Sequence, residues 1–175
     1  MKVLAVSGSL RAQSINSAFC RAVARLNPAD CAVRVYSGMS ALPLFNPDLQ
    51  SSAPAEVLRL CEDVAWSDAL LIASPEYAHG VSGVLKNALD WLVSFEGAVG
   101  KPVALVNTSP RAHHARDSLA EILHTMSMVV VDSASVSVPL LGYCRNEDEI
   151  LRSPEAQGAI ERLMSALASH LRQGE

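Results

Sequence analysis

The sequence predicts an α/β protein in which helices cover both faces of a parallel sheet, the doubly wound sandwich. Short apolar runs alternate with segments whose apolar residues recur at helical spacing, and this alternation repeats five times along the chain. No repeat, linker or low-complexity stretch interrupts it, so residues 1–175 are predicted to form a single domain. At 175 residues the chain is long enough to bury about 70% of its unfolded surface.

The first half of the chain contains three predicted strands and two helices. Residues 2–7 form an apolar run that ends at a glycine and a polar turn, as a buried parallel strand does. Residues 14–26 follow with helical spacing and stop at an Asn-Pro pair. After a second strand at 31–36 and a surface loop at 38–53, Pro54 opens a helix with apolar residues at i, i+3, i+4 and i+7. A third strand, Ala-Leu-Leu-Ile-Ala, follows at 69–73.

The second half continues the alternation. A helix is predicted over 81–95, and a fourth strand begins at Val103 after Gly-Lys-Pro. One apolar face, which includes Leu119 and Met126, marks a fourth helix. Residues 128–138 contain a fifth strand with an interruption near Asp132-Ser133, and apolar residues from 160 to 171 define a closing helix.

Composition excludes several classes of function. The chain has 14 Lys and Arg against 18 Asp and Glu, a net charge of -4, and no basic run, which argues against nucleic acid as the main partner. No apolar stretch approaches the length of about 20 residues that a membrane helix needs, and the start of the chain reads as a core strand rather than a signal peptide. We therefore expect a cytoplasmic protein with no membrane partner.

The cysteines indicate the same compartment. Cys20, Cys31, Cys61 and Cys144 are widely separated, without C-x-x-C or zinc spacing. Isolated cysteines of this kind are typically small buried residues in a reducing environment. A redox thiol or an extracellular disulfide framework is the alternative.

Ligands of doubly wound sheets bind outside the carboxyl ends of the strands. After the first strand, the free N–H groups of a helix N-terminus, the hydroxyls of Ser9 and Ser14 and the amide of Asn16 would meet a phosphate, and Arg11 would balance its charge. The loop has neither the G-x-G-x-x-G pattern of dinucleotide sites nor the lysine of a P-loop. The alternative is that Ser14 is an ordinary N-cap and Arg11 a solvated side chain.

The loop after the third strand is predicted to be rigid. Pro75 fixes its own φ angle and holds Ser74 extended. A rigid loop suits a site whose backbone N–H groups face a heterocycle.

Three segments carry a resemblance to a known family. Gly8-Ser9-Leu10-Arg11-x-x-Ser14-x-Asn16 resembles the phosphate loop of the NADPH-dependent FMN reductase family, which includes flavodoxin-like quinone, azo and chromate reductases. Residues 42–49 (Leu-Pro-Leu-Phe-Asn-Pro-Asp-Leu) and 74–77 (Ser-Pro-Glu-Tyr), followed by 83–91, resemble later parts of that family in the same order. The resemblance implies a flavodoxin-like three-layer sandwich with a five-stranded parallel sheet of order 2-1-3-4-5.

The resemblance also implies a function and a site. The chain would be an oxidoreductase that passes a hydride from NADPH or NADH, through bound FMN, to a small electrophilic acceptor (a quinone, an azo compound, chromate or free flavin) in a ping-pong cycle. The phosphate would be held by Ser9, Arg11, Ser14, Asn16 and Ser17. The ring would be framed by Pro75, Glu76, Tyr77, Ala78, His79, Gly80 and Ser109. No catalytic side chain and no metal are expected, because the cofactor carries the chemistry.

Some of these residues have a structural alternative, and the chain departs from the family at two places. Glu76 would contact the ligand or anchor the loop or the next helix, and His79 would face the ring or solvent. Ala78 stands where the family frequently has Asn. The family also frequently has a Ser-x-x-Gly-Gly stretch after the fourth strand; this chain keeps Ser109-Pro110 but has bulkier, basic residues in place of the glycines. We hypothesise that Arg111 or Arg116 in this region favours the 2′-phosphate of NADPH.

The helix that follows this region carries, on one face, residue types that bind metal ions. His114, Asp117, Glu121 and His124 share one side of it. Spread over three turns, these side chains are too far apart for one ion, so an exposed polar face is expected.

The apolar surface of the helix at 81–95 is wider than packing on a sheet requires. The surplus, including Trp91 and Phe95, predicts a subunit interface, and the family resemblance implies a homodimer or homotetramer. A helix partly covered by residues 96–98 is the alternative.

Two other functions stay open at this point. One is a flavodoxin-like electron carrier, although such carriers are more acidic and lack an arginine in the phosphate loop. The other is a non-catalytic binding module of the same fold that has lost the flavin. A serine hydrolase is disfavoured because G-x-S-x-G does not occur.

Overall fold

The protein is described from a computed structural model that covers residues 1–109, 113–140, 142, 144 and 146–174. Its central sheet is parallel, with the strand order β2-β1-β3-β6-β7 and with β8 also beside β6. The strands are β1 (Lys2–Ser7), β2 (Ala32–Val35), β3 (Ala69–Ala73), β6 (Pro102–Asn107), β7 (Val129–Val130) and β8 (Val136–Ser137). The predicted order 2-1-3-4-5 is confirmed, with β7 and β8 together standing for the fifth predicted strand.

The break in this edge strand falls at the predicted place. Asp132–Ala134 form a short 3-10 helix between β7 and β8. Ser135 compensates for the lost strand pairing, because its hydroxyl accepts a hydrogen bond from Leu105 N at 3.1 Å and donates one to Val131 O at 3.0 Å. The strand therefore pairs with β6 on both sides of the break.

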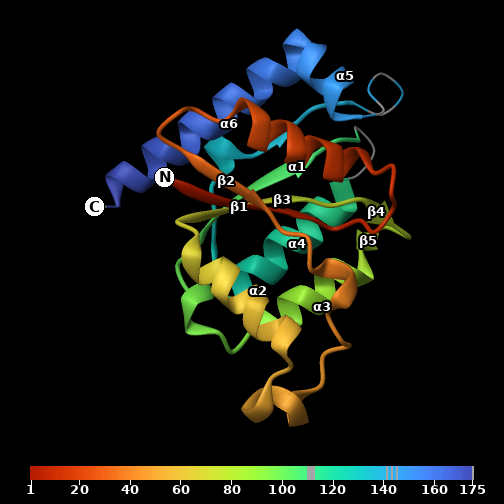
Figure 1. Cartoon of the computed structure of the whole chain (residues 1–175), viewed down its shortest axis with the longest axis vertical. Helices are drawn as coiled ribbons and strands as arrows, with labels where there is room; N and C mark the ends of the chain where they lie inside the picture. Colours follow the sequence, from red (N-terminus) through yellow and green to blue (C-terminus); the bar gives the residue numbers. More distant parts are fainter. Residues whose placement is uncertain (110–112, 141, 143, 145, 175) are drawn as a thin grey trace.

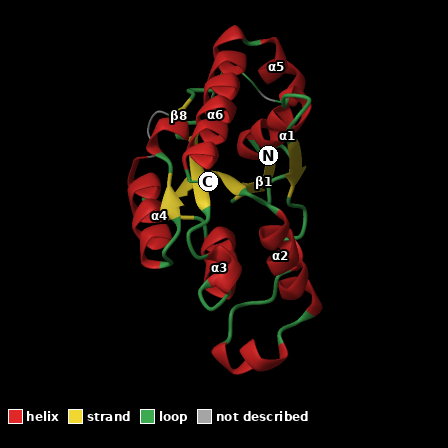
Figure 2. Cartoon of the chain, turned by 90° about the vertical axis from the view of Figure 1, so that its left-hand side faces the viewer, coloured by secondary structure: helices red, strands yellow, loops and turns green. Residues whose placement is uncertain are grey.

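Helices cover both faces of the sheet (Figures 1 and 2). One face carries α1 (Ile15–Leu26), α5 (Glu147–Arg152) and α6 (Pro154–Gln173), and the other carries α2 (Ala55–Trp66), α3 (Gly83–Leu92) and α4 (His113–Thr125). Side chains alternate between the faces along each strand. In β1, Val3 and Ala5 join the core under α1 and α6, whereas Leu4 and Val6 join the core under α2, α3 and α4.

The chain between β2 and α2 is a surface loop, as predicted, but it packs on α3. It contains two short 3-10 helices, η1 (Met39–Ala41) and η2 (Pro47–Ser52). Asn87 Nδ2 and Trp91 Nε1 both donate to Pro43 O at 2.9 Å, and Asn87 Oδ1 accepts from Phe45 N at 2.8 Å. The Phe45 ring stands edge-on to the Trp91 ring, with centroids 5.1 Å apart.

This loop covers Trp91, a residue that the sequence placed in a predicted subunit interface. Trp91 is only 3% exposed, because the chain's own loop covers it. The prediction that Trp91 forms part of a subunit interface is therefore wrong. Phe95 is half-buried, and α3 ends at Leu92, earlier than the helix predicted over 81–95.

The segment before the last helix contains α5, which the sequence analysis did not predict. Glu147 pairs with Arg21 at 2.5 Å and with Arg25 at 3.0 Å, and Asp148 pairs with Arg25 at 2.7 Å. Hydrogen bonds from Arg21 and Arg25 lower the pKa of Glu147 below its ordinary value. These pairs attach α5 to α1. In the described part of the chain, no helix has the length and apolar character needed to cross a membrane.

Candidate functional site

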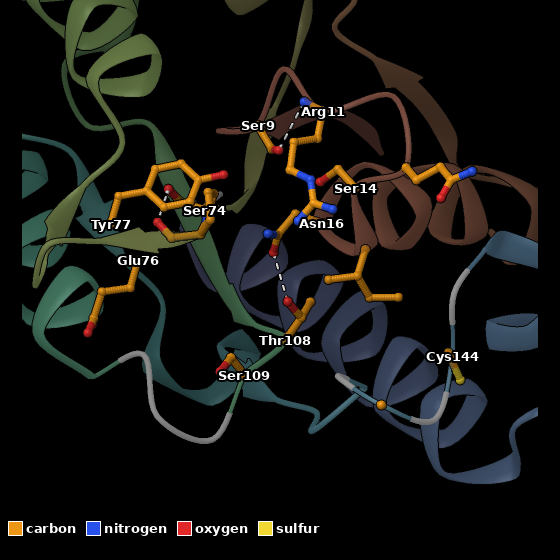
Figure 3. A pocket seen from close by; sticks show the side chains of 14 residues that line it. Ser9, Arg11, Ser14, Asn16, Ser74, Glu76, Tyr77, Thr108, Ser109 and Cys144 are labelled. Atoms are coloured by element: carbon orange, nitrogen blue, oxygen red, sulfur yellow. Dashed lines mark hydrogen bonds between the residues drawn. The ribbon is translucent and has the colours of Figure 1, made fainter.

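A cavity of about 500 Å³ opens at the carboxyl ends of β1, β3 and β6, where a ligand of a doubly wound sheet is expected (Figure 3). This volume lies within the range of small-molecule sites, roughly 300–1,000 Å³. The cavity is lined by Ser9, Arg11, Gln13, Ser14, Ile15, Asn16, Ser74, Pro75, Glu76, Tyr77, Thr108, Ser109, Gly142 and Cys144.

One end of the cavity lies at the start of α1. Ser14 is the N-cap of the helix, and its hydroxyl accepts from Ser17 N at 3.3 Å. Ser9 Oγ accepts from Arg11 N at 3.3 Å, and Asn16 Oδ1 accepts from the Thr108 hydroxyl at 2.9 Å.

These contacts leave donors for a ligand. Each of the three side-chain oxygens is occupied as an acceptor by the protein itself, whereas a hydroxyl or an amide nitrogen also carries hydrogens to donate. Ser14 and Asn16 are 5% and 4% exposed, so their donors are held in a nearly buried position. The Arg11 side chain reaches the same end of the cavity (Figure 3). Hydroxyl, amide, guanidinium and helix N-terminal N–H groups are the kinds of donor that bind anions in proteins.

The loop between β1 and α1 begins at Gly8, which is closely packed against the residues after β3. Gly8 N donates to Ala73 O at 2.9 Å, which continues the pairing of β1 with β3 past the end of the strands. A Cβ on Gly8 would lie only 2.6 Å from Ser74 Oγ and 3.0 Å from Ser82 Oγ. A side chain at this position would therefore crowd Ser74 and Ser82 at the start of the loop.

The opposite wall is a short hairpin rather than a loop. β4 (Glu76–Tyr77) pairs antiparallel with β5 (Gly80–Val81). The turn residues Ala78 and His79 have φ angles of 49° and 58°, as a two-residue type I′ turn requires. Tyr77, half of whose surface is exposed, stands on the first strand at the mouth of the cavity (Figure 3).

Glu76 has a structural task in this wall. Its Oε2 accepts from Ala115 N at 2.8 Å, in the first turn of α4. The carboxylate thus binds one of the unpaired N–H groups of a helix start. This contact supports the anchoring alternative, with α4 rather than the following α3 as the anchored helix, although Glu76 also lines the cavity.

The structure brings most of the predicted ligand residues together. Ser9, Arg11, Ser14, Asn16, Pro75, Glu76, Tyr77 and Ser109 line the cavity. Four predicted residues lie outside the lining: Ser17, Ala78, His79 and Gly80. Ser17 Oγ instead lies 2.8 Å from Ser7 Oγ, and the ring of His79 stacks on His114 with centroids 4.4 Å apart.

Several lining residues were not predicted from the sequence. Ser74 and Thr108 adjoin predicted site residues at strand ends, so the same topological argument could have included them. Gly142 and Cys144 come from the chain between β8 and α5, where no motif gave a signal. Burial raises the pKa of the Cys144 thiol, so this side chain lines the cavity as a neutral thiol.

Of the two arginines proposed to select NADPH, the structure describes only Arg116. Arg111 lies outside the described residues. Arg116 does not line the cavity; its guanidinium lies 3.8 Å from Asp132 and 4.0 Å from Asp117. The selection of the 2′-phosphate by Arg116 is thus not supported by its position.

Known proteins share this architecture. The family described as NADPH-dependent FMN reductase matches residues 1–140. An NAD(P)H-dependent FMN reductase of Pseudomonas aeruginosa is 39% identical over 112 residues, which are 62% of this chain and 60% of that protein. A quinone reductase of Pseudomonas putida is 38% identical over 128 residues, 67% of this chain and 68% of its own length. Among solved structures, the flavoenzyme NAD(P)H:(acceptor) oxidoreductase of Paracoccus denitrificans is similar with a TM-score of 0.75 and 27% identity, covering 97% of this chain and 98% of the other.

Proposed function

The chain belongs to the NADPH-dependent FMN reductase family, and on this premise we propose that it is an NAD(P)H-dependent oxidoreductase with FMN as its cofactor and a small electrophilic acceptor as its second substrate. Quinones, azo compounds, chromate and free flavin are the acceptor classes. The observation that carries the proposal is the set of donors at the start of α1, because their acceptor atoms are already occupied within the protein.

The residues present fit FMN. The phosphate would be held by Ser9, Arg11, Ser14 and Asn16 together with the first N–H groups of α1. The close contact at Gly8 brings the start of this loop against the end of β3, at the edge of the sheet where the cavity opens. Pro75, Tyr77 and Ser109 would border the ring system.

When held between the start of α1 and the Pro75–Tyr77 wall, FMN would supply the hydride and electron-transfer chemistry of a ping-pong cycle between NAD(P)H and the acceptor. The contribution of the chain is to bind and orient. The hairpin β4–β5 is fixed to α4 through Glu76, which keeps the Pro75–Tyr77 wall in place. Fixed positioning of this kind contributes by holding reactants in a productive geometry.

Self-association stays part of the proposal. The exposed apolar side chains that would support it are Leu44, 84% exposed in the loop packed on α3, and Val93, 62% exposed just after that helix. Light scattering of the purified protein would show a dimer or a tetramer, and a monomer at micromolar concentration would contradict this part of the proposal.

Steady-state kinetics test the proposed activity. Protein loaded with FMN should oxidise NADPH or NADH continuously with benzoquinone as acceptor, and reciprocal plots at several acceptor concentrations should be parallel. The Arg11→Ala variant should need a higher FMN concentration for the same rate, because it lacks the cation at the phosphate end. An electron carrier would show no continuous NAD(P)H oxidation by itself, and that result would exclude the proposed activity.

A further inference from the structure

Thr108 is a nearly buried residue that lines the cavity, and neither the expected site residues nor the family resemblance included it. It follows the last residue of β6 and is 3% exposed. Backbone hydrogen bonds to the chain after β8 hold it in place. Thr108 O accepts from Leu140 N at 3.2 Å, and the neighbouring Asn107 O accepts from Val138 N at 2.8 Å. The side chain is therefore presented from a rigid strand end.

The hydroxyl makes one long-range contact. Thr108 Oγ1 donates to Asn16 Oδ1 at 2.9 Å, across 92 residues of sequence (Figure 3). Asn16 lies in the first turn of α1, after the N-cap Ser14. The contact connects two walls of the cavity, one from β6 and one from α1.

In this contact Thr108 holds the oxygen end of the Asn16 amide, which leaves the nitrogen end for a ligand. An asparagine side chain has one acceptor oxygen and one nitrogen with two donor hydrogens. With the oxygen on Thr108, the nitrogen is the group left for the cavity, beside the free N–H groups of the helix start. The reversed amide would place an acceptor oxygen against an anion, which is repulsive.

We propose that Thr108 is a positioning residue, which holds the Asn16 amide with its N–H groups directed at the phosphate of the cofactor. The proposal rests on the proposed function for the identity of the ligand, FMN. It adds a specific claim: the hydroxyl of Thr108 contributes to recognition of the phosphate and not of the ring. Loss of the hydroxyl removes the donor that holds the Asn16 oxygen, so the amide can turn its oxygen toward the phosphate, and this costs phosphate affinity.

The test compares two substitutions of Thr108. Thr108→Val keeps the shape and removes the hydroxyl, whereas Thr108→Ser keeps the hydroxyl. Flavin-free protein is titrated with FMN and with riboflavin, and quenching of flavin fluorescence gives each Kd. We expect Thr108→Val to weaken FMN binding about tenfold and riboflavin binding by less than twofold, and Thr108→Ser to bind FMN within about threefold of the wild type.

A double-mutant cycle distinguishes positioning from a general effect on the fold. In the Asn16→Ala background, Thr108→Val should cause no further loss of FMN affinity, because the amide that it positions is gone. Equal losses for FMN and riboflavin, failure of Thr108→Ser to restore binding, or additive effects in the cycle would each overturn the proposal.

A second probe separates this inference from the proposed function. Inorganic phosphate should raise the melting temperature of the wild type, and the increase should be smaller in Thr108→Val. If phosphate behaves in this way but FMN does not bind, the cofactor assignment fails and the role of Thr108 at an anion site stands. If phosphate stabilises the wild type and Thr108→Val equally, or stabilises neither, the inference about Thr108 is wrong.

Discussion

Replacing Gly8 with alanine tests how tightly the start of the phosphate loop is packed. The added Cβ would lie 2.6 Å from Ser74 Oγ, 3.0 Å from Ser82 Oγ and 3.1 Å from Ser74 Cβ. The hydroxyls can rotate, but Ser74 Cβ is fixed to its backbone. Relief therefore requires movement of the loop or of β3. Overpacking of this kind costs about 1–3 kcal/mol, and because a backbone-fixed atom is among the contacts, we expect a loss of about 2 kcal/mol in the free energy of unfolding.

The assay is urea denaturation followed by circular dichroism, combined with an FMN titration. If the loop moves, the donors that follow Gly8 move with it, so the Kd for FMN should rise at least about tenfold, which corresponds to about 1.4 kcal/mol. Adding Ser74→Ala removes the 2.6 Å contact but not the Cβ contact, and should restore only part of the stability.

Gly83→Ala is the matched control for this substitution. A Cβ at Gly83, in the first turn of α3, meets no atom within 4 Å. Alanine there should leave stability unchanged or raise it by up to about 1 kcal/mol. If Gly8→Ala unfolds within about 0.5 kcal/mol of the wild type and binds FMN equally well, the close-packing argument is refuted.

Three further predictions concern the hairpin, the loop on α3 and the cysteines. Ala78 has a φ of 49°, so Ala78→Asn should raise the free energy of unfolding by about 0.5 kcal/mol; equal or lower stability in urea would contradict the strain. Asn87→Ala removes two hydrogen bonds to the loop 38–53, and limited proteolysis should then cut this loop several-fold faster, with an unchanged cleavage rate as the contrary result. Burial raises the pKa of Cys20 to about 12 and, less strongly, that of the half-buried Cys61; iodoacetamide at pH 8 should therefore modify Cys61 first in the native protein, and equal rates by mass spectrometry would contradict this order.

The elements that the sequence predicted correctly are those with local causes. The Asn27-Pro28 pair ends α1 at Leu26, and Ser14 caps its start. The interruption at Asp132-Ser133 is present because polar residues there cannot continue a buried strand, and Ser135 replaces the missing partner of β6. Ser9, Arg11, Ser14 and Asn16 line the cavity because the carboxyl end of the first strand is a topologically determined position.

The features that the sequence did not predict depend on contacts between distant residues. Trp91 was assigned to an interface because nothing in its neighbourhood indicates that Pro43, 48 residues earlier, accepts its N–H. The hairpin after β3 was missed because Ala-His is not a turn sequence that favours positive φ angles. Thr108 and Asn16 are 92 residues apart. They pair because the end of β6 and the start of α1 lie next to each other at one edge of the sheet.

The spectrum of the purified protein under anaerobic conditions tests the central claim most directly. After incubation with FMN and removal of the unbound flavin, the protein should be yellow, with absorbance near the visible maximum of flavin. Addition of NADPH or NADH without oxygen should bleach this absorbance, and addition of a quinone should restore it. A protein that retains no FMN, or whose bound FMN keeps its colour with either nicotinamide nucleotide, would contradict the assignment.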